Sequence, residues 1–373
     1  MHRHRIKISI VLFLVMLLST GCWDSADIEH KDITTAVLID KTETGYAFYA
    51  EIASLVGGGT GESSQGSMPR SQVIHGGGAT FVEAREALER QSDQRIYLAS
   101  VQNVIFTETI LYSGIEHYLY RFRQNPEYRK RAMVAATGEK PEDLFSAASE
   151  HNTLVGLAIN DTIESLVDTG QLYHFTMGDV LEALACPCKG YLIPRVSLVG
   201  QDVAADGYCV MYGGICKGYI PIDEGKFIVY VQGKAPPFHY AIPYEENSIT
   251  VEIRLKKNPT KVDYRDGQIK FCLDMVCQAD LLYMKDDFAM DAAAMEEIEE
   301  KLERQLTAEF RNIVHASQKV YGVDYLRFHE AFHIHYPDEY KQVDWKAAYP
   351  EAEIAVDVAV ELGGGNIDYE PEA

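Results

Sequence analysis

An apolar stripe in the last third of the chain is the feature that most constrains its fold. Between Asp287 and Tyr321, apolar or small residues recur at steps of three or four, which predicts one long helix with a single apolar face. The stripe consists of Met295, Ile298, Leu302, Leu306, Phe310, Ile313, Ser317 and Val320. No other segment carries a matching stripe, so a coiled coil is disfavoured and this face is expected to pack against a sheet.

Strand patterns flank this helix. Ile249–Leu255 and Gln268–Ala279 precede it and Glu353–Leu362 follows it, each with strand-like alternation of apolar and polar residues. A period of two predicts strands. We therefore expect a C-terminal α+β domain over residues 241–365 that contains the long helix, followed by an acidic tail at residues 366–373.

The N-terminal half predicts alternating strands and helices. Ile33–Asp40 and Tyr46–Ser54 are typical of a hairpin, and Thr80 is placed to cap a helix. The segment Gly57–Gly78 is rich in Gly and Ser but lacks the Gly-Lys-Ser/Thr sequence of a phosphate-binding loop, so a flexible loop is expected there. Further strands are expected at Val101–Phe106 and Ala132–Thr137, with helices at Gly114–Phe122, Pro141–Ala148, Asn152–Val167 and Met177–Ala185. This pattern favours an N-terminal α/β domain over residues 22–195.

Short β-like runs occupy the middle of the chain. They are Val196–Ala204, Tyr208–Ile215, Gly218–Pro221 and Lys226–Val231. They predict a small β-rich central domain over residues 196–240. The roughly 350 residues after Cys22 exceed what one core usually supports. The expected fold class is therefore α+β, with three mixed sheet-plus-helix domains.

The first 22 residues have the parts of a bacterial export signal. Three basic residues precede an apolar run at residues 8–18, which is much shorter than the roughly 20 residues of a membrane-spanning helix. Small residues and Cys22 follow, so residues 1–21 are predicted to be a lipoprotein signal peptide whose removal leaves Cys22 with diacylglyceryl and N-acyl groups. Ser19 departs from the leucine that usually stands three residues before the cysteine. The alternatives are an ordinary secretory signal and an uncleaved anchor, with Cys22 incidental.

The charge of the chain limits its partners. It carries 34 Lys and Arg against 56 Asp and Glu, a formal net charge of −22. Removing the three basic residues before Cys22 leaves 31 Lys and Arg and a charge of −25. Such a chain repels nucleic acid and anionic lipid headgroups. Nucleic acid is therefore not an expected partner, and the lipid rather than the protein surface is expected to hold the chain at a membrane.

Six cysteines follow Cys22: Cys186, Cys188, Cys209, Cys216, Cys272 and Cys277. Cys186 and Cys188 are too close in sequence to bridge each other easily, so any pairing is expected to involve more distant partners. A zinc site from the first four cysteines is an alternative, but their spacing matches no standard zinc knuckle. Buried free thiols are the simpler interpretation.

His329, Glu330 and His333 fit the H-E-x-x-H pattern of zinc proteases. In that pattern two histidines one helical turn apart bind zinc and the glutamate activates water. No third ligand is placed by the sequence, and Pro337 limits the helix shortly afterwards. The simpler interpretation is a helix turn that happens to hold histidines, so no catalytic residue and no cofactor is expected.

An ordered set of short segments carries a family resemblance. It comprises Cys22-Trp23-Asp24, Asp27-Ile28-Glu29, Ala36–Lys41, Gly77–Phe81 with Glu83-Ala84, Asn103–Thr109, Gly114-Ile115, Arg121–Arg123, Gly213–Ile215, Gly218-Tyr219, Gln318, Asp324, Pro337, Trp345 and the closing strand. The set resembles the Ger(x)C spore germination lipoproteins over nearly the whole chain. In that family the place of His329 is commonly a glycine, which argues further against catalytic zinc, and the Cys186-Pro187-Cys188 segment is a departure.

The resemblance implies three α+β domains on a lipid anchor at the outer face of the inner spore membrane. It implies a C subunit that assembles with integral membrane A and B subunits into a receptor for nutrients such as amino acids or sugars. It carries over no catalytic residue. A solute-binding lipoprotein of a transport system is the main alternative, and a zinc metalloprotease through His329, Glu330 and His333 is a lesser one.

Overall fold

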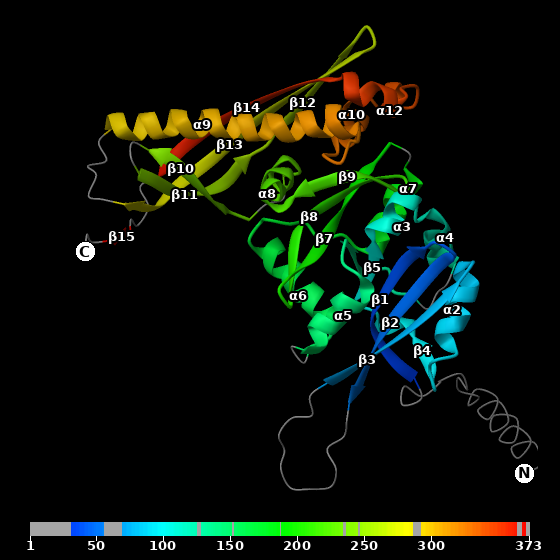
Figure 1. The fold of residues 1–373 in the computed structure, drawn as a ribbon. Coiled ribbons are helices and arrows are strands. Elements are labelled where there is room, and N and C mark those ends of the chain that lie inside the picture. The colour runs from blue at the N-terminus through cyan, green and yellow to red at the C-terminus, as the bar shows by residue number, and fades with distance from the viewer. Residues whose placement is uncertain are drawn as a thin grey trace, which may run out of the picture.

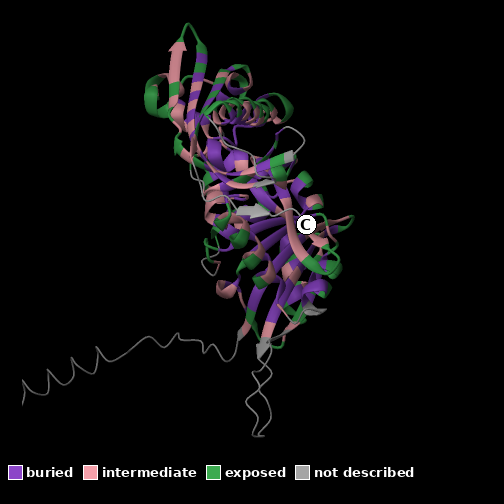
Figure 2. Cartoon of the chain, turned by 90° about the vertical axis from the view of Figure 1, so that its left-hand side faces the viewer, coloured by how far each residue is buried: buried purple, intermediate pink, exposed green. Residues whose placement is uncertain are grey.

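Two mixed β-sheets with packed helices make up the computed structural model of the chain (Figure 1). The α+β class expected from the sequence is confirmed. The structure describes residues 31–55, 69–124, 128–150, 153–186, 188–233, 236–244, 247–285, 292–363 and 368–370. The two sheets lie end to end, so the described part of the chain is elongated, and buried residues concentrate along the strands (Figure 2).

The first sheet has nine strands in the order β3-β2-β1-β5-β6-β7-β8-β9, with β4 paired to β1. Their bounds are β1 Lys31–Thr42, β2 Gly45–Leu55, β3 Pro69–Gly78, β4 Arg95–Tyr97, β5 Asn103–Thr107, β6 Met133–Thr137, β7 Gly190–Val199, β8 Asp202–Tyr212 and β9 Ile215–Pro221. The four central strands β1, β5, β6 and β7 are parallel, and an antiparallel pair extends each side. The predicted β1–β2 hairpin is confirmed.

Helices cover both faces of this sheet, so β5 and β6 at its centre are buried throughout. In β5, Val104 and Phe106 face one core while Ile105 faces the other, as the alternation of a strand requires. The first core is covered by α2 (Phe81–Glu89), α3 (Glu108–Ser113), α4 (Glu116–Gln124) and α7 (Met177–Ala185), and the second by α5 (Pro141–Glu150) and α6 (Val155–Asp168). A short 3₁₀ turn, η2 (Leu98–Ser100), precedes β5.

The second sheet has six strands in the order β10-β11-β13-β12, with β14 and β15 paired in parallel to β13. Their bounds are β10 Phe238–Tyr244, β11 Asn247–Lys257, β12 Thr260–Arg265, β13 Gln268–Lys285, β14 Glu353–Gly363 and β15 Asp368–Glu370. The long helix α9 (Ala292–His315) runs along this sheet and continues as the π-helical turn η3 (Ala316–Tyr321) (Figure 1). The predicted stripe is its buried face from Ile298 to Ile313 and continues at the buried Ser317, but Val320, also expected on this face, is 66% exposed. Four short elements then follow: α10 Phe328–His335, α11 Pro337–Tyr340, α12 Trp345–Ala348 and η4 Tyr349–Glu351.

Helix α8 (Ile222–Val231) joins the two sheets. Its apolar residues share one hydrophobic core with Tyr208 and Ile220 of the first sheet and with Phe310 of α9. The sheets therefore do not have separate interiors at this point. The expectation of a strand at Lys226–Val231 is wrong, because this run is the second half of a helix.

Two further expectations are corrected by the strand topology. Residues 196–221, expected to begin a separate central domain, belong to β7, β8 and β9 of the first sheet, so two sheets replace the three expected. The last part of the glycine-rich segment, expected to be loop, is strand β3, which pairs with β2 over Pro69–Gly78. The rest of that segment, residues 57–68, lies outside the described residues.

Candidate functional site

The predicted lipidation site, Cys22, lies outside the residues that the structure describes, as does the export signal before it. The lipid anchor therefore stays a prediction. Among the described helices, none combines the length and the apolar character that a membrane crossing requires.

A buried carboxylate organises the segment that carries the H-E-x-x-H pattern. Asp324 is 2% exposed and lies just before α10. It accepts hydrogen bonds from the backbone N–H groups of Phe328 (3.0 Å) and His329 (2.7 Å) and from Trp345 Nε1 (3.1 Å). His329 Nδ1 lies 3.0 Å from the same carboxylate. Asp324 thus satisfies the free amides at the start of α10 and fixes the orientation of the His329 ring.

The three side chains of the pattern are held in different ways. His329 is buried on Asp324 and its Nε2 lies 3.9 Å from Glu330 Oε1, Glu330 pairs with Arg327 at 2.7 Å, and the exposed His333 stacks on Tyr340 with ring centroids 4.6 Å apart. Within the described part of the chain, their ligand atoms do not converge as a set within 4.8 Å. The pattern therefore does not form the zinc site of a protease, and His329 is placed instead against two cysteines.

Cys186 and Cys188 are joined by a disulfide, which corrects the expectation that they would not bridge each other. Their Cα atoms are 5.4 Å apart, within the ordinary range for a disulfide. This separation arises because α7 ends at Ala185 and the backbone of Cys186 is already extended. The pair lies between α7 and β7 of the first sheet.

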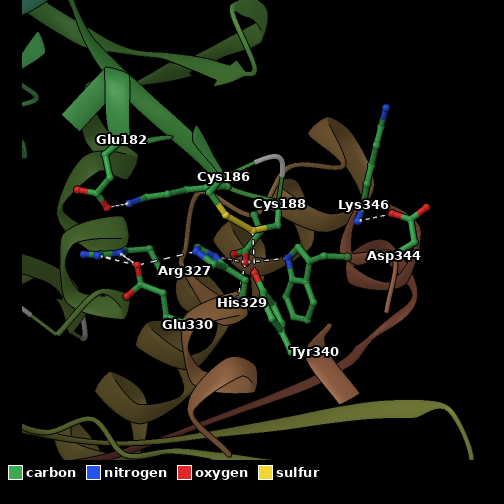
Figure 3. The surroundings of a disulfide bond; sticks show 12 residues. Glu182, Cys186, Cys188, Arg327, His329, Glu330, Tyr340, Asp344 and Lys346 are labelled. Carbon is green, nitrogen blue, oxygen red and sulfur yellow. Dashed lines mark hydrogen bonds and ion pairs between the residues drawn. A yellow bond between two sulfur atoms is a disulfide. The ribbon is translucent and has the colours of Figure 1, made fainter. Parts of the chain in front are cut away.

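The disulfide lies against α10 and α11, at the junction of the two sheets (Figure 3). Ligand atoms of Cys186, Cys188 and His329 all lie within 4.8 Å of one another. The Tyr340 hydroxyl is 2.8 Å from Cys188 Sγ and donates to it, since a disulfide sulfur carries no hydrogen. Burial, with the nearby Asp324 and Glu330 carboxylates, raises the pKa of Tyr340 above its ordinary value. Tyr340 therefore remains a hydrogen-bond donor at neutral pH.

The remaining cysteines do not join this cluster. Cys209 and Cys216 are buried on β8 and β9, where they hydrogen-bond each other; the bond from Cys209 lowers the pKa of Cys216 to about 7. Burial raises the pKa of Cys277 to about 12, and the Cys272 thiol donates to Asp274 at 2.9 Å. The four-cysteine zinc site considered from the sequence is not assembled among the described residues.

A second buried carboxylate, Glu51 on β2, was not singled out by the sequence patterns. It is 1% exposed and accepts hydrogen bonds from Thr35 Oγ1 (2.6 Å), Val155 N (2.7 Å) and Gly156 N (3.1 Å). It thereby joins β1 and β2 to the first turn of α6. Burial raises the pKa of Glu51 above its ordinary value. An acid within an otherwise apolar strand was the available signal.

A cavity of about 300 Å³ opens beside α2 and α4 in the first sheet's larger core. Its walls combine aromatic rings with two arginines. They are Phe48, Phe81, Arg85, Tyr118, Arg121, Phe122, Gln124 and Tyr128. Its size is at the lower end for small-molecule sites, and its walls suit a small apolar or anionic ligand.

Family models and individual relatives among known proteins both match this chain. The family model "Spore germination protein N-terminal domain" matches residues 24–198, and "Spore germination B3/GerAC like, C-terminal" matches residues 206–364. The chain is 21% identical to spore germination protein KC of Bacillus subtilis (strain 168), over 95% of this chain and 94% of that protein. It is 20% identical to spore germination protein B3 of the same organism, over 94% and 96% of the two chains.

A solved structure shares the fold. The crystal structure of the GerBC protein superposes with a TM-score of 0.55 at 16% identity, over 87% of this chain and 96% of that chain. Together the two family models cover both sheets except residues 199–205 around the β7–β8 turn and the short strand β15. The chain therefore belongs to the Ger(x)C family of spore germination proteins, the family of germinant receptor C subunits.

Proposed function

We propose that this chain is the lipid-anchored C subunit of a nutrient germinant receptor. Cys22 carries the diacylglyceryl and N-acyl groups and holds the body at the outer face of the inner spore membrane. There the body assembles with integral membrane A and B subunits, and the complex triggers germination in response to an amino acid or a sugar. The observation that carries the proposal is the match to both family models, the first of which begins two residues after Cys22.

The length of the tether supports this arrangement. Nine residue steps separate Cys22 from Lys31, where β1 begins, and a fully extended chain of that length spans roughly 30 Å. The start of β1 therefore stays within about that distance of the bilayer. The net charge of −25 that remains without the three basic residues before Cys22 disfavours direct adsorption to anionic headgroups. The acyl chains thus supply the membrane affinity, and the protein surface is left for its partners.

Spores that carry Cys22→Ala test the proposal against spores that lack the chain. We expect both strains to sporulate normally and to lose the response to one nutrient class, and we expect the Cys22→Ala protein to leave the membrane fraction. Cys272→Ala is the matched control, because it removes a cysteine from β13 and leaves the anchor intact. It should germinate normally and stay in the membrane fraction.

Two outcomes would contradict the proposal. Normal germination of the chain-lacking spores to every amino acid and sugar would argue against the receptor role. Full membrane association of the Cys22→Ala protein would argue against the lipid anchor. A solute-binding lipoprotein would instead show saturable binding of a small solute to the isolated chain, with the cavity beside α2 and α4 as its site, and a transport defect in growing cells.

A further inference from the structure

Three soft or borderline ligand groups meet where the two sheets join. Cys186 follows α7 and Cys188 precedes β7, both of the first sheet, while His329 belongs to α10 beside the second. Their ligand atoms lie within 4.8 Å of one another (Figure 3). Ligands of one tetrahedral zinc ion, at about 2.0–2.3 Å from the metal, lie roughly 3.3–3.8 Å apart. The three groups are therefore close to the separation that a shared ion requires.

The surroundings of His329 prepare it as a ligand. Asp324 Oδ2 lies 3.0 Å from its Nδ1 and accepts the hydrogen of that nitrogen, which leaves Nε2, 3.9 Å from Glu330 Oε1, as the ring atom that can bind a metal. The same carboxylate oxygen is fixed by Trp345 Nε1 at 3.1 Å and by the backbone of His329 itself. A carboxylate that orients a histidine in this way is the usual support of a metal-bound histidine.

The chemistry of the set favours zinc. Two thiolates and one neutral imidazole suit a borderline-soft ion that accepts tetrahedral sulfur and nitrogen ligands. Two thiolates also cancel the charge of Zn²⁺, which matters because His329 is only 5% exposed and the Asp324 carboxylate lies beside it. The Tyr340 hydroxyl, 2.8 Å from Cys188 Sγ, is placed to donate to the coordinated sulfur.

We propose that, when the Cys186–Cys188 disulfide is reduced, the two thiolates and His329 Nε2 bind one Zn²⁺ ion. The fourth position is open to water. The ion would link the end of α7 to the start of α10 and so join the two sheets through their shared boundary. This site differs from the H-E-x-x-H arrangement, since it uses His329 and neither Glu330 nor His333.

The disulfide and the zinc site are alternatives that exchange through a dithiol reductant. Two electrons and two protons pass from the dithiol to the disulfide, so the Cys186–Cys188 S–S bond becomes two S–H groups and the reductant closes its own S–S bond. Zn²⁺ then displaces the two thiol protons, which are released to solvent.

Metal content of the full chain, purified in detergent, tests the proposal. The protein is divided into an untreated sample and one reduced with dithiothreitol, each is incubated with ZnCl₂ and desalted without oxygen, and zinc is counted by mass spectrometry. We expect one tightly held zinc ion per reduced chain and none per oxidised chain. Co²⁺ in place of Zn²⁺ should give the thiolate charge-transfer band and the intense visible bands of a tetrahedral sulfur site.

Single variants separate this site from the other metal-binding groups of the chain. Cys188→Ser and His329→Gln should lose the bound zinc, while His333→Gln and Cys272→Ser should retain it. Trp345 fluorescence reports whether each variant is folded. If Cys188→Ser does not fold, the Co²⁺ spectrum of the reduced and oxidised wild-type chain decides.

Four outcomes would overturn the inference. Three concern zinc content: equal zinc in the oxidised and reduced chains, retention of zinc by a folded Cys188→Ser chain, and loss of zinc from His333→Gln. The fourth is the absence of sulfur bands in the Co²⁺ spectrum of the reduced chain. None of these measurements depends on germination, so they test the zinc site independently of the proposed receptor role.

Discussion

Two buried acids, Glu51 and Asp324, hold the first turns of α6 and α10. Each accepts backbone N–H groups at the start of its helix, where the amides have no partner within the helix and the positive end of the helix dipole favours a carboxylate. Hydrogen bonds to a charged acceptor are the stronger kind. These contacts therefore fix where two helices begin. In the case of Glu51, the helix lies far along the chain from the strand that carries the acid.

The pH dependence of stability provides a test of Glu51. Burial raises the pKa of Glu51 in the folded chain, whereas the unfolded chain keeps the ordinary value. As the pH rises from that ordinary value through the raised one, the folded state binds more protons than the unfolded state, so the free energy of unfolding falls. We expect this fall to be reduced in Glu51→Gln, measured as urea unfolding at a series of pH values.

A matched control separates this effect from general acid titration. Glu43 lies in the exposed turn between β1 and β2, so Glu43→Gln should keep the wild-type pH dependence. A Glu51→Gln chain whose stability varies with pH as steeply as the wild type would show that Glu51 does not titrate in this range on folding.

The cysteine–histidine contact could not be predicted at the residue scale. Sequence spacing identified His329 as a candidate ligand but paired it with His333, because i and i+4 residues share a helix face. The structure turns His329 onto Asp324 and toward Cys186 and Cys188, which come from the other sheet. Such a contact depends on how α7 and α10 are placed in space, and no local pattern encodes that.

At the scale of single elements, the strands and the amphipathic helices were predictable from the sequence. Segments that pack closely on another element, or that are apolar at nearly every position, were not. The apolar stripe of α9 and the Thr80 cap of α2 follow from side-chain periodicity and capping, and both are confirmed. The run Lys226–Val231 is apolar at nearly every position, so its period does not distinguish a buried strand from a buried helix. Pro221 and the acids Asp223 and Glu224 were the available signals of a helix start.

The glycines of β3 show a packing role that composition did not reveal. The glycine-rich composition of this segment predicted a flexible loop instead. A Cβ atom on Gly76 would lie 2.1 Å from Leu88 N and 2.4 Å from Ala84 O. Helix α2 therefore packs directly on the backbone of the strand, which only glycine allows. Gly77 points to the opposite, exposed face, where a Cβ would meet only Tyr46 O at 3.8 Å.

Substitution of these neighbouring glycines is a sharp test of the packing. Gly76→Ala should lower the free energy of unfolding by about 1–3 kcal/mol, because the helix must move away from the strand. Gly77→Ala should leave it unchanged or raise it by up to about 1 kcal/mol, since the backbone loses freedom only in the unfolded chain. The measurement is urea unfolding of both variants. Equal effects at the two positions would contradict the close approach of α2.

At the scale of the whole molecule, the structure consists of two sheets that share a hydrophobic core at their boundary. The two family models meet between residues 198 and 206, yet the first sheet continues through β8 and β9, and α8 contributes to a core that extends to α9. The alternation of elements predicted the mixed sheets. It could not show that β7, β8 and β9 extend the first sheet, because strand order is set by contacts between distant segments.

The short tether between Cys22 and the first sheet gives the last prediction, which rests on the proposed receptor role. Insertion of a flexible Gly/Ser segment of about 20 residues between Cys22 and Lys31 should lower the effective concentration of the body at its membrane partners roughly fivefold, because that concentration falls as about the −3/2 power of tether length. We expect membrane association to be unchanged and nutrient-triggered germination to be slower. The same segment inserted within residues 57–68 adds equal mass without lengthening the tether, so it should leave the germination rate at the wild-type value. An unchanged rate with the lengthened tether would show that the body does not need to be held close to the membrane.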